Sequence, residues 1–149
     1  MTKYFEDYRV GDKIVSPRRT VTEADVTILL GICRYSEPIM IDEEYAKTTR
    51  FGGRIVQGRV ALALAGGLLV LGRVFDDETT ICAVETKNVR YVNPLRIGDT
   101  IGVEVEFIDK KETSKADVGL VAHKEVCKNQ KGETILEVEE THLVQRRPV

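Results

Sequence analysis

Two titratable side chains, Tyr35 and Glu37, lie shortly before the most apolar run of the sequence, residues 57–71. This run is too short to span a bilayer comfortably, and it is predicted to form a buried helix. The N-terminus of a helix presents free N–H groups and the positive end of the helix dipole, which favour developing negative charge. Pro38 and the Gly52-Gly53 pair place irregular backbone beside that N-terminus. We therefore expect any chemistry of the chain at this place.

The composition restricts the classes of protein to which the chain can belong. Its 149 residues, without a Pro- or Ser-rich linker or an internal repeat, predict one domain over residues 1–149. A hydrophobic fraction of 42% and a charged fraction of 31% are typical of a globular protein, and a net charge of −2 argues against nucleic-acid binding. The first residues lack the apolar segment of a secretory signal, so we expect a cytoplasmic protein that does not bind a membrane.

The three cysteines, Cys33, Cys82 and Cys127, are scattered and odd in number. They form no pair or cluster at the spacing of metal ligands, so the sequence indicates neither a disulfide framework nor a zinc site. We predict that they are single buried thiols.

Local signals predict the elements that must position the site. Thr22, with Asp25 three residues later, predicts a capped helix, and Asp42 is expected to cap a short helix that ends near Lys47. A first strand is predicted over residues 13–20. Alternating apolar and polar residues predict four further strands, over residues 79–91, 100–108, 115–127 and 133–145.

This order of elements predicts an α+β fold in which an antiparallel sheet of five or more strands wraps around the long buried helix. The last four strands are expected to form a meander, and the helix is expected to be covered on all sides. Val118, Leu120 and Ala122 are predicted to share one face of their strand. His123 and His142 lie in the last two strands and are interpreted as solvent-facing or cross-strand partners rather than catalytic groups.

Several short motifs, in order along nearly the whole chain, carry a resemblance to a known family. They are Tyr4-Phe5-Glu6-Asp7-Tyr8, Val10-Gly11-Asp12, Thr20-Val21-Thr22-Glu23-Ala24-Asp25, Ile41-Asp42-Glu43-Glu44-Tyr45-Ala46-Lys47, Phe51-Gly52-Gly53-Arg54-Ile55, Asn93-Pro94-Leu95 and Gly98-Asp99-Thr100. In these motifs the chain resembles the MaoC-like dehydratases, a hot-dog-fold family that includes the R-specific enoyl-CoA hydratases. The resemblance implies a single hot-dog domain that acts on acyl thioesters.

The chain departs from the family pattern at the catalytic residues. The signature resembles Gly-Asp-x-Asn-Pro-x-His, and its acid, asparagine and histidine positions are Tyr35, Glu37 and Met40 here. The His-Gly pair that opens the buried helix in the family becomes Gln57-Gly58. The usual Asp/His dyad is therefore absent.

Hydration of a 2-enoyl thioester requires a base, an acid and donors for the negative charge that develops on the thioester oxygen. Glu37 is the nearby candidate for the base, Tyr35 for the acid and Gln57 for orienting the substrate, while the amide of Gly58 can bind the thioester carbonyl. Met40 is expected to contact an acyl chain. Two alternatives stay open: Glu37 is a solvated loop acid, and Gln57 hydrogen-bonds the loop at the helix terminus.

Three functions remain compatible with this pattern. The first is a hydratase or dehydratase of 2-enoyl thioesters with a rearranged acid–base set. The second is a non-catalytic acyl-thioester-binding subunit that pairs with a dyad-bearing hot-dog chain, and the third is a thioesterase. We expect a homodimer or a higher homo-oligomer, or a heterodimer with a related chain, because single hot-dog sheets leave edges exposed. No metal or redox cofactor is implied, and coenzyme A enters only as part of the substrate.

Overall fold

The structure is a computed structural model that describes residues 2–148. The N-terminal part consists of short elements, namely the 3-10 helix η1 (Phe5–Asp7) and the strands β1 (Lys13–Val15) and β2 (Arg19–Thr20). Four α-helices follow: α1 (Glu23–Cys33), α2 (Pro38–Ile41), α3 (Glu43–Thr48) and α4 (Gly58–Leu71). The chain then forms four long strands, β3 (Thr80–Tyr91), β4 (Thr100–Glu112), β5 (Val118–Lys128) and β6 (Thr134–Gln145). Within this described part, no helix is long and apolar enough to cross a membrane.

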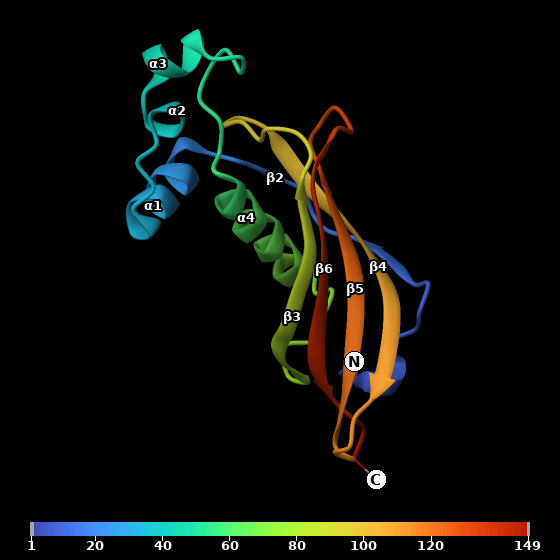
Figure 1. The fold of residues 1–149 in the computed structure, drawn as a ribbon. Coiled ribbons are helices and arrows are strands. Elements are labelled where there is room, and N and C mark those ends of the chain that lie inside the picture. Colours follow the sequence, from blue (N-terminus) through green and yellow to red (C-terminus); the bar gives the residue numbers. More distant parts are fainter. Residues whose placement is uncertain (1, 149) are drawn as a thin grey trace.

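The strands form one antiparallel six-stranded sheet in the order β1-β4-β5-β6-β3, and β2 pairs with β4 beyond this path. Helix α4 packs along one face of the sheet, while α1, α2 and α3 lie together beyond its N-terminal end (Figure 1). The predicted α+β hot-dog architecture, with more than five strands around a long helix, is therefore confirmed.

The predicted four-strand meander is wrong at its first strand. Strands β4, β5 and β6 follow one another as expected, but β3 pairs with β6 instead of β4. The second edge of β4 is already occupied by β1 and β2, so β3 finds its partner at the opposite side of the sheet. The connection after β3 is fixed there, because the N–H groups of Val92 and Asn93 both donate to the carbonyl of Ile135.

The helix starts agree with the predicted caps. The Thr22 hydroxyl accepts from the Asp25 N–H at 3.2 Å, and the Asp25 carboxylate accepts from the Thr22 N–H at 3.0 Å, which closes a capping box. Asp42 caps α3 by accepting from the Tyr45 N–H at 3.0 Å. The one-turn helix α2 was not predicted; it begins at Pro38, whose fixed φ suits the first helical position.

The predicted first strand is divided into β1 and β2 because Pro17, between them, has no N–H to donate to the sheet. In β4 the predicted alternation is confirmed, since Ile101, Val103, Val105 and Phe107 are all buried.

In β5, Val118, Leu120 and Ala122 share a face as predicted, but most of the deeply buried side chains of the strand lie on the other face. Leu120 and Ala122 are only partly buried, whereas the alternate side chains of Val121, His123 and Glu125 point into the core. Two polar residues occupy the inner face of this strand, so hydrophobicity no longer marks the buried side.

Two further expectations need correction. Helix α4 is not covered on all sides within one chain: Val60, Ala65 and Leu68 are buried, but Val70 and Leu71 are exposed. Of the three thiols only Cys127 is buried, and its burial raises its pKa to about 12, while Cys33 and Cys82 are exposed. Both findings leave apolar or reactive groups on the surface of the single chain.

The closest packing of the sheet on the N-terminal segment occurs at Gly119 in β5. A Cβ added there would overlap the ring of Phe5, which is itself buried. We expect Gly119→Ala to lower the free energy of unfolding by about 1–3 kcal/mol, because overpacking forces neighbouring groups apart. Urea denaturation measures this loss, and Phe5→Leu in the same chain should recover part of it. An unchanged midpoint for Gly119→Ala would contradict this account of the packing.

Candidate active site at the N-terminus of helix α4

The first turn of α4 has one N–H group left for a ligand. Ala61 donates to the carbonyl of Gln57 at 2.9 Å in the regular helical pattern. The N–H groups of Arg59 and Val60 both donate to the side-chain oxygen of Gln57, at 2.5 and 3.2 Å. Among the residues described, the N–H of Gly58 has no hydrogen-bond partner. This donor lies at the positive end of the helix dipole, where it can stabilise an anionic oxygen.

The side chain of Tyr91, from the sheet, packs closely against Gly58 at the start of α4. The ring of Tyr91, at the end of β3, lies so close that a Cβ on Gly58 would be 2.9 Å from its Cε1 atom. The Tyr91 side chain is about half exposed, so it borders the helix start without being part of the core. The ring of Tyr91 therefore lies against the first residue of α4, whose N–H is free.

A cavity of about 510 Å³ lies between α1 and the α2 segment. Its walls combine apolar side chains with a few polar ones, as is common for small-molecule sites. The lining residues are Val26, Thr27, Leu30, Gly31, Arg34, Tyr35, Ser36, Met40, Ile41 and Arg54. The cavity is large enough for an acyl group and holds no carboxylate in its lining.

Two backbone features direct the segment around Tyr35 toward this cavity. Arg34 ends α1 in the left-handed conformation, with φ at 56°, and the Tyr35 N–H donates to the carbonyl of Leu30 at 3.1 Å. The Ile55 N–H donates to the carbonyl of Ile39 at 3.4 Å, which ties α2 to the strand-like segment that enters α4. The hydrogen bond between Ile55 and Ile39 thus joins the backbone beside the cavity to the segment that leads into α4.

Arg54 connects the helices that surround the cavity. Its guanidinium bonds both oxygens of Glu23 in α1, at 3.0 and 2.8 Å, and its Nε donates to Glu43 in α3 at 3.1 Å. The hydrogen bonds from Arg54 hold the pKa of Glu23 below its usual value, and the two carboxylates raise the pKa of Arg54. Through these bonds Arg54 joins α1 to α3 beside the cavity.

The structure brings together only part of the predicted site. Tyr35 and Met40 are half-buried and line the cavity, whereas Gln57 and Gly58 lie at the start of α4. Glu37 is exposed, precedes α2 and does not cap that helix with its side chain. The side-chain oxygen of Gln57 accepts from the N–H groups of Arg59 and Val60 in the first turn of α4, and not from the loop that the alternative named.

Sequence reasoning missed two residues of this region. Tyr91 reaches Gly58 from β3, and no local pattern predicts this contact. Arg54 was noted only as part of a motif, because its place between Glu23 and Glu43 arises in the fold and both acids precede it in the sequence.

His123 and His142 are not solvent-facing as one interpretation had them. His123 is fully buried and its Nε2 lies 2.7 Å from a carboxylate oxygen of Glu125, while burial lowers the pKa of His142. The pairing of His123 with Glu125 had a signal in the sequence, because residues two apart on a strand share a face. None of these three residues lines the cavity described above, and His142 lines a different one.

Comparisons with known proteins agree with the fold. The family model described as "MaoC like domain" matches residues 7–131. An (R)-specific enoyl-CoA hydratase of Rhodospirillum rubrum is 28% identical over 144 residues, which are 97% of this chain and 93% of that protein. A solved structure described as a monoamine oxidase regulatory protein, from an Archaeoglobus species, has a TM-score of 0.90 and 34% identity, with 99% of this chain and 97% of that chain covered.

The protein MaoC of Klebsiella aerogenes is 34% identical over 113 residues, which are 76% of this chain. The matched segment covers 32% of the Klebsiella protein, so the similarity extends over about one third of the length of that protein. The family model spans far more than half of the present chain, and the hot-dog architecture is the one that the resemblance implies. The chain therefore belongs to the family of MaoC-like domains, the MaoC-like hydratases and dehydratases.

Proposed function

We propose that the chain catalyses the reversible hydration of a 2-enoyl thioester, with the thioester carbonyl held by the N–H of Gly58. The observation that carries this proposal is the single unpartnered N–H at the start of α4, beside a glycine that the Tyr91 ring leaves no room to replace. A preorganised backbone donor at a helix N-terminus stabilises the oxyanion of an enolate-like transition state.

The proton steps fall to the side chains that precede α2. Glu37 takes a proton from a water molecule while the oxygen of that water bonds to carbon 3 of the enoyl group. Tyr35 delivers a proton to carbon 2. Dehydration reverses both transfers, and no redox change occurs. Tyr35 lines the cavity, and the exposed position of Glu37 gives its carboxylate direct access to water. Met40, which has no exchangeable proton, contacts the acyl chain.

The names of the relatives support this reaction class. The Rhodospirillum relative, matched along nearly its whole length, is named an (R)-specific enoyl-CoA hydratase, and a Methylorubrum extorquens relative with 33% identity over 106 residues is named a 3-hydroxybutyryl-CoA dehydratase. Coenzyme A is accordingly the first carrier to test, as part of the substrate.

Glu37→Gln is expected to lower kcat for hydration by about 10²–10⁴-fold, because the base is removed while the shape of the side chain is kept. The measurement follows the loss of absorbance of crotonyl-CoA and of longer and branched 2-enoyl-CoAs. Binding of the thioester should change little, since Glu37 does not line the cavity.

Glu44→Gln is the matched control, because Glu44 is an exposed acid of α3 whose oxygen pairs with Lys47 at 2.7 Å. It should hydrate at the wild-type rate. Wild-type rates for Glu37→Gln would remove Glu37 from the mechanism, and the alternative of a solvated loop acid would then hold.

A second function is favoured by one specific feature of the cavity. Its lining contains no carboxylate or histidine, and Met40 occupies the position of the family histidine. This supports a non-catalytic subunit that binds acyl thioesters and pairs with a dyad-bearing hot-dog chain. Thermal stabilisation by acyl-CoA without any turnover would select this function over the first.

We also propose that the chain assembles at least as a dimer. Strand β3 forms one edge of the sheet, and the apolar side chains of Ile81 and Val84 are about half exposed there. An exposed apolar edge is a surface for pairing with another chain.

A further inference from the structure

Three side chains that bind metals well meet on the inner face of the sheet. His123 of β5 stands opposite Glu140 of β6, and His142 follows on the same face of β6. One ligand atom from each residue lies within 4.8 Å of the other two. The two imidazole rings are stacked with their centroids 5.4 Å apart.

One ring nitrogen of each histidine, the Nδ1 atom, is buried and lacks a partner among the described residues. The Nδ1 atoms of His123 and His142 are inaccessible to solvent and make no hydrogen bond among the residues described. A buried polar atom without a partner is costly, and native proteins seldom leave one. His123 as a whole is fully buried, so bulk water does not reach its Nδ1.

Glu125 is placed to orient the ring of His123, as carboxylates do in metal sites. Its carboxylate oxygen lies 2.7 Å from Nε2, and Glu125 is itself only 2% exposed. When Nε2–H donates to that carboxylate, Nδ1 carries the lone pair. Metal-binding histidines in proteins commonly have this arrangement, in which a carboxylate orients the ring and raises its basicity.

We propose that His123, His142 and Glu140 bind one divalent transition-metal ion of the zinc class through the two Nδ1 atoms and a carboxylate oxygen. Two imidazoles and a carboxylate form a common ligand set for such ions, and bond lengths of about 2.0–2.2 Å require only small side-chain rotations to close the present cluster. The ion would also neutralise the carboxylates of Glu125 and Glu140, for which the cluster offers no arginine or lysine partner within the described chain.

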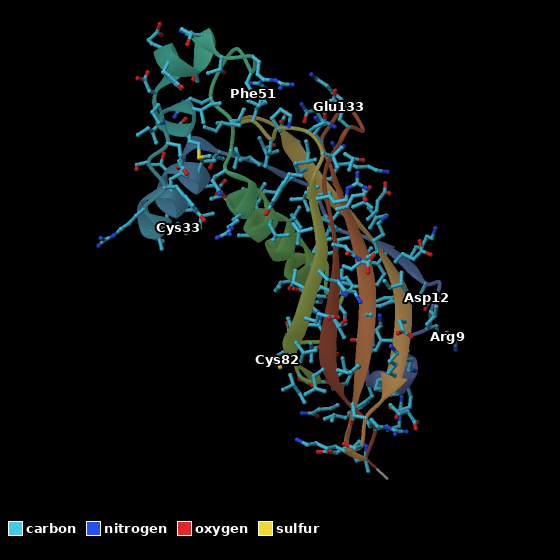
Figure 2. All side chains as sticks on the ribbon, in the orientation of Figure 1. Arg9, Asp12, Cys33, Phe51, Cys82 and Glu133 are labelled. Atoms are coloured by element: carbon cyan, nitrogen blue, oxygen red, sulfur yellow. The ribbon has the colours of Figure 1, made fainter. Side chains whose placement is uncertain are left out.

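A cavity beside the cluster gives an ion a route to it. Glu140 and His142 line a cavity of about 310 Å³, and Phe75 packs over both rings, with its centroid 4.3 Å from that of His142 and 5.0 Å from that of His123. Cys82 also lines this cavity. Figure 2 shows Cys82 at the lower end of β3, whereas Phe51 lies at the other end, near α3. The proposed ion is therefore separate from the thioester site at the start of α4.

The test is titration of chelator-treated protein with Zn²⁺ in a calorimeter, together with NMR spectra of the histidine rings. The sequence has two histidines, and both belong to the cluster, so each ring signal reports on the site. We expect one Zn²⁺ per chain, shifts of both ring signals, and for Co²⁺ the visible absorption of a site with nitrogen and oxygen ligands.

Three substitutions separate this site from adventitious binding. Glu140→Gln keeps the shape of a ligand and should weaken Zn²⁺ binding at least tenfold. Glu125→Gln changes only the residue that orients His123 and should weaken binding about 10–100-fold. Glu139→Gln, on the outer face of the same strand, is the matched control and should bind as the wild type does.

Each outcome decides the proposal. Zn²⁺ binding that Glu140→Gln weakens and Glu139→Gln leaves intact would support it, and so would a Zn²⁺-dependent rise in Tm that Glu140→Gln loses and Glu139→Gln keeps. Ring signals that do not move at millimolar Zn²⁺ would overturn it. Equal Zn²⁺ affinity of Glu140→Gln and Glu139→Gln would also overturn it and would indicate an adventitious ion only. The NMR titration of the wild type stands even if a variant fails to fold.

Discussion

Gly58→Ala is expected to lower kcat/KM for 2-enoyl thioester hydration by about 10²–10³-fold, the usual cost of losing one oxyanion donor. The added Cβ would lie 2.9 Å from Cε1 of Tyr91, so either the ring or the first turn of α4 must move. Because Gln57 already occupies the next two N–H groups, no neighbouring donor can replace the Gly58 N–H when it is displaced. The proposed function therefore predicts a loss of rate far larger than the loss of stability.

The control for a general effect on the helix is Gly67→Ala. A Cβ at Gly67 would meet nothing within 4 Å, so this variant should keep its activity and gain about 1 kcal/mol from the better helix propensity of alanine. Combining Gly58→Ala with Tyr91→Ala removes the ring and should restore part of the rate. Steady-state kinetics and circular dichroism measure both effects. Wild-type kcat/KM in the single variant Gly58→Ala would contradict an oxyanion role for this backbone amide.

The fold was predictable where local signals determine structure. The cap of α1 at Thr22, the cap of α3 at Asp42 and the apolar length of α4 depend on side chains within one or two turns of each other. The alternation in β4 also identified its buried face. The position of β3 was not predictable in this way, because the choice between β4 and β6 depends on β1 and β2 occupying one edge of β4.

The candidate site was predictable to the same extent. The start of α4 follows from the end of an apolar run, so Gln57 and Gly58 could be located as the helix terminus. The contact of Tyr91 with Gly58 and the meeting of His123 with His142 depend on strand pairing and register, which a local pattern does not contain. Polar residues on an inner face also weaken the hydrophobic signal. In β5 the apolar pattern therefore does not mark the more deeply buried face, which carries His123 and Glu125.

Val84→Lys is expected to convert a dimer of the chain into monomers. Strand β3 has twelve residues, pairs with β6 on one side only and exposes Val84 at 51% and Ile81 at 49%. Val70 of α4 is also exposed and lines the same cavity as Ile81, so the apolar surface extends from the strand onto the helix. Antiparallel pairing of β3 with its copy about a two-fold axis would bury this surface on both chains. A lysine at the centre of that contact would place a charge in an apolar interface.

Light scattering at micromolar concentration measures the effect, with the mass falling from twice 16.7 kDa toward 16.7 kDa. The matched control is Val15→Lys, because Val15 is 71% exposed on β1 at the opposite edge of the sheet and should leave the dimer intact. A monomeric wild type, or a dimer that survives Val84→Lys, would exclude assembly through β3. Since the unpaired edge and the exposed side of α4 adjoin, such a result would require another explanation for why the exposed side of this helix carries the apolar side chains of Val70 and Leu71.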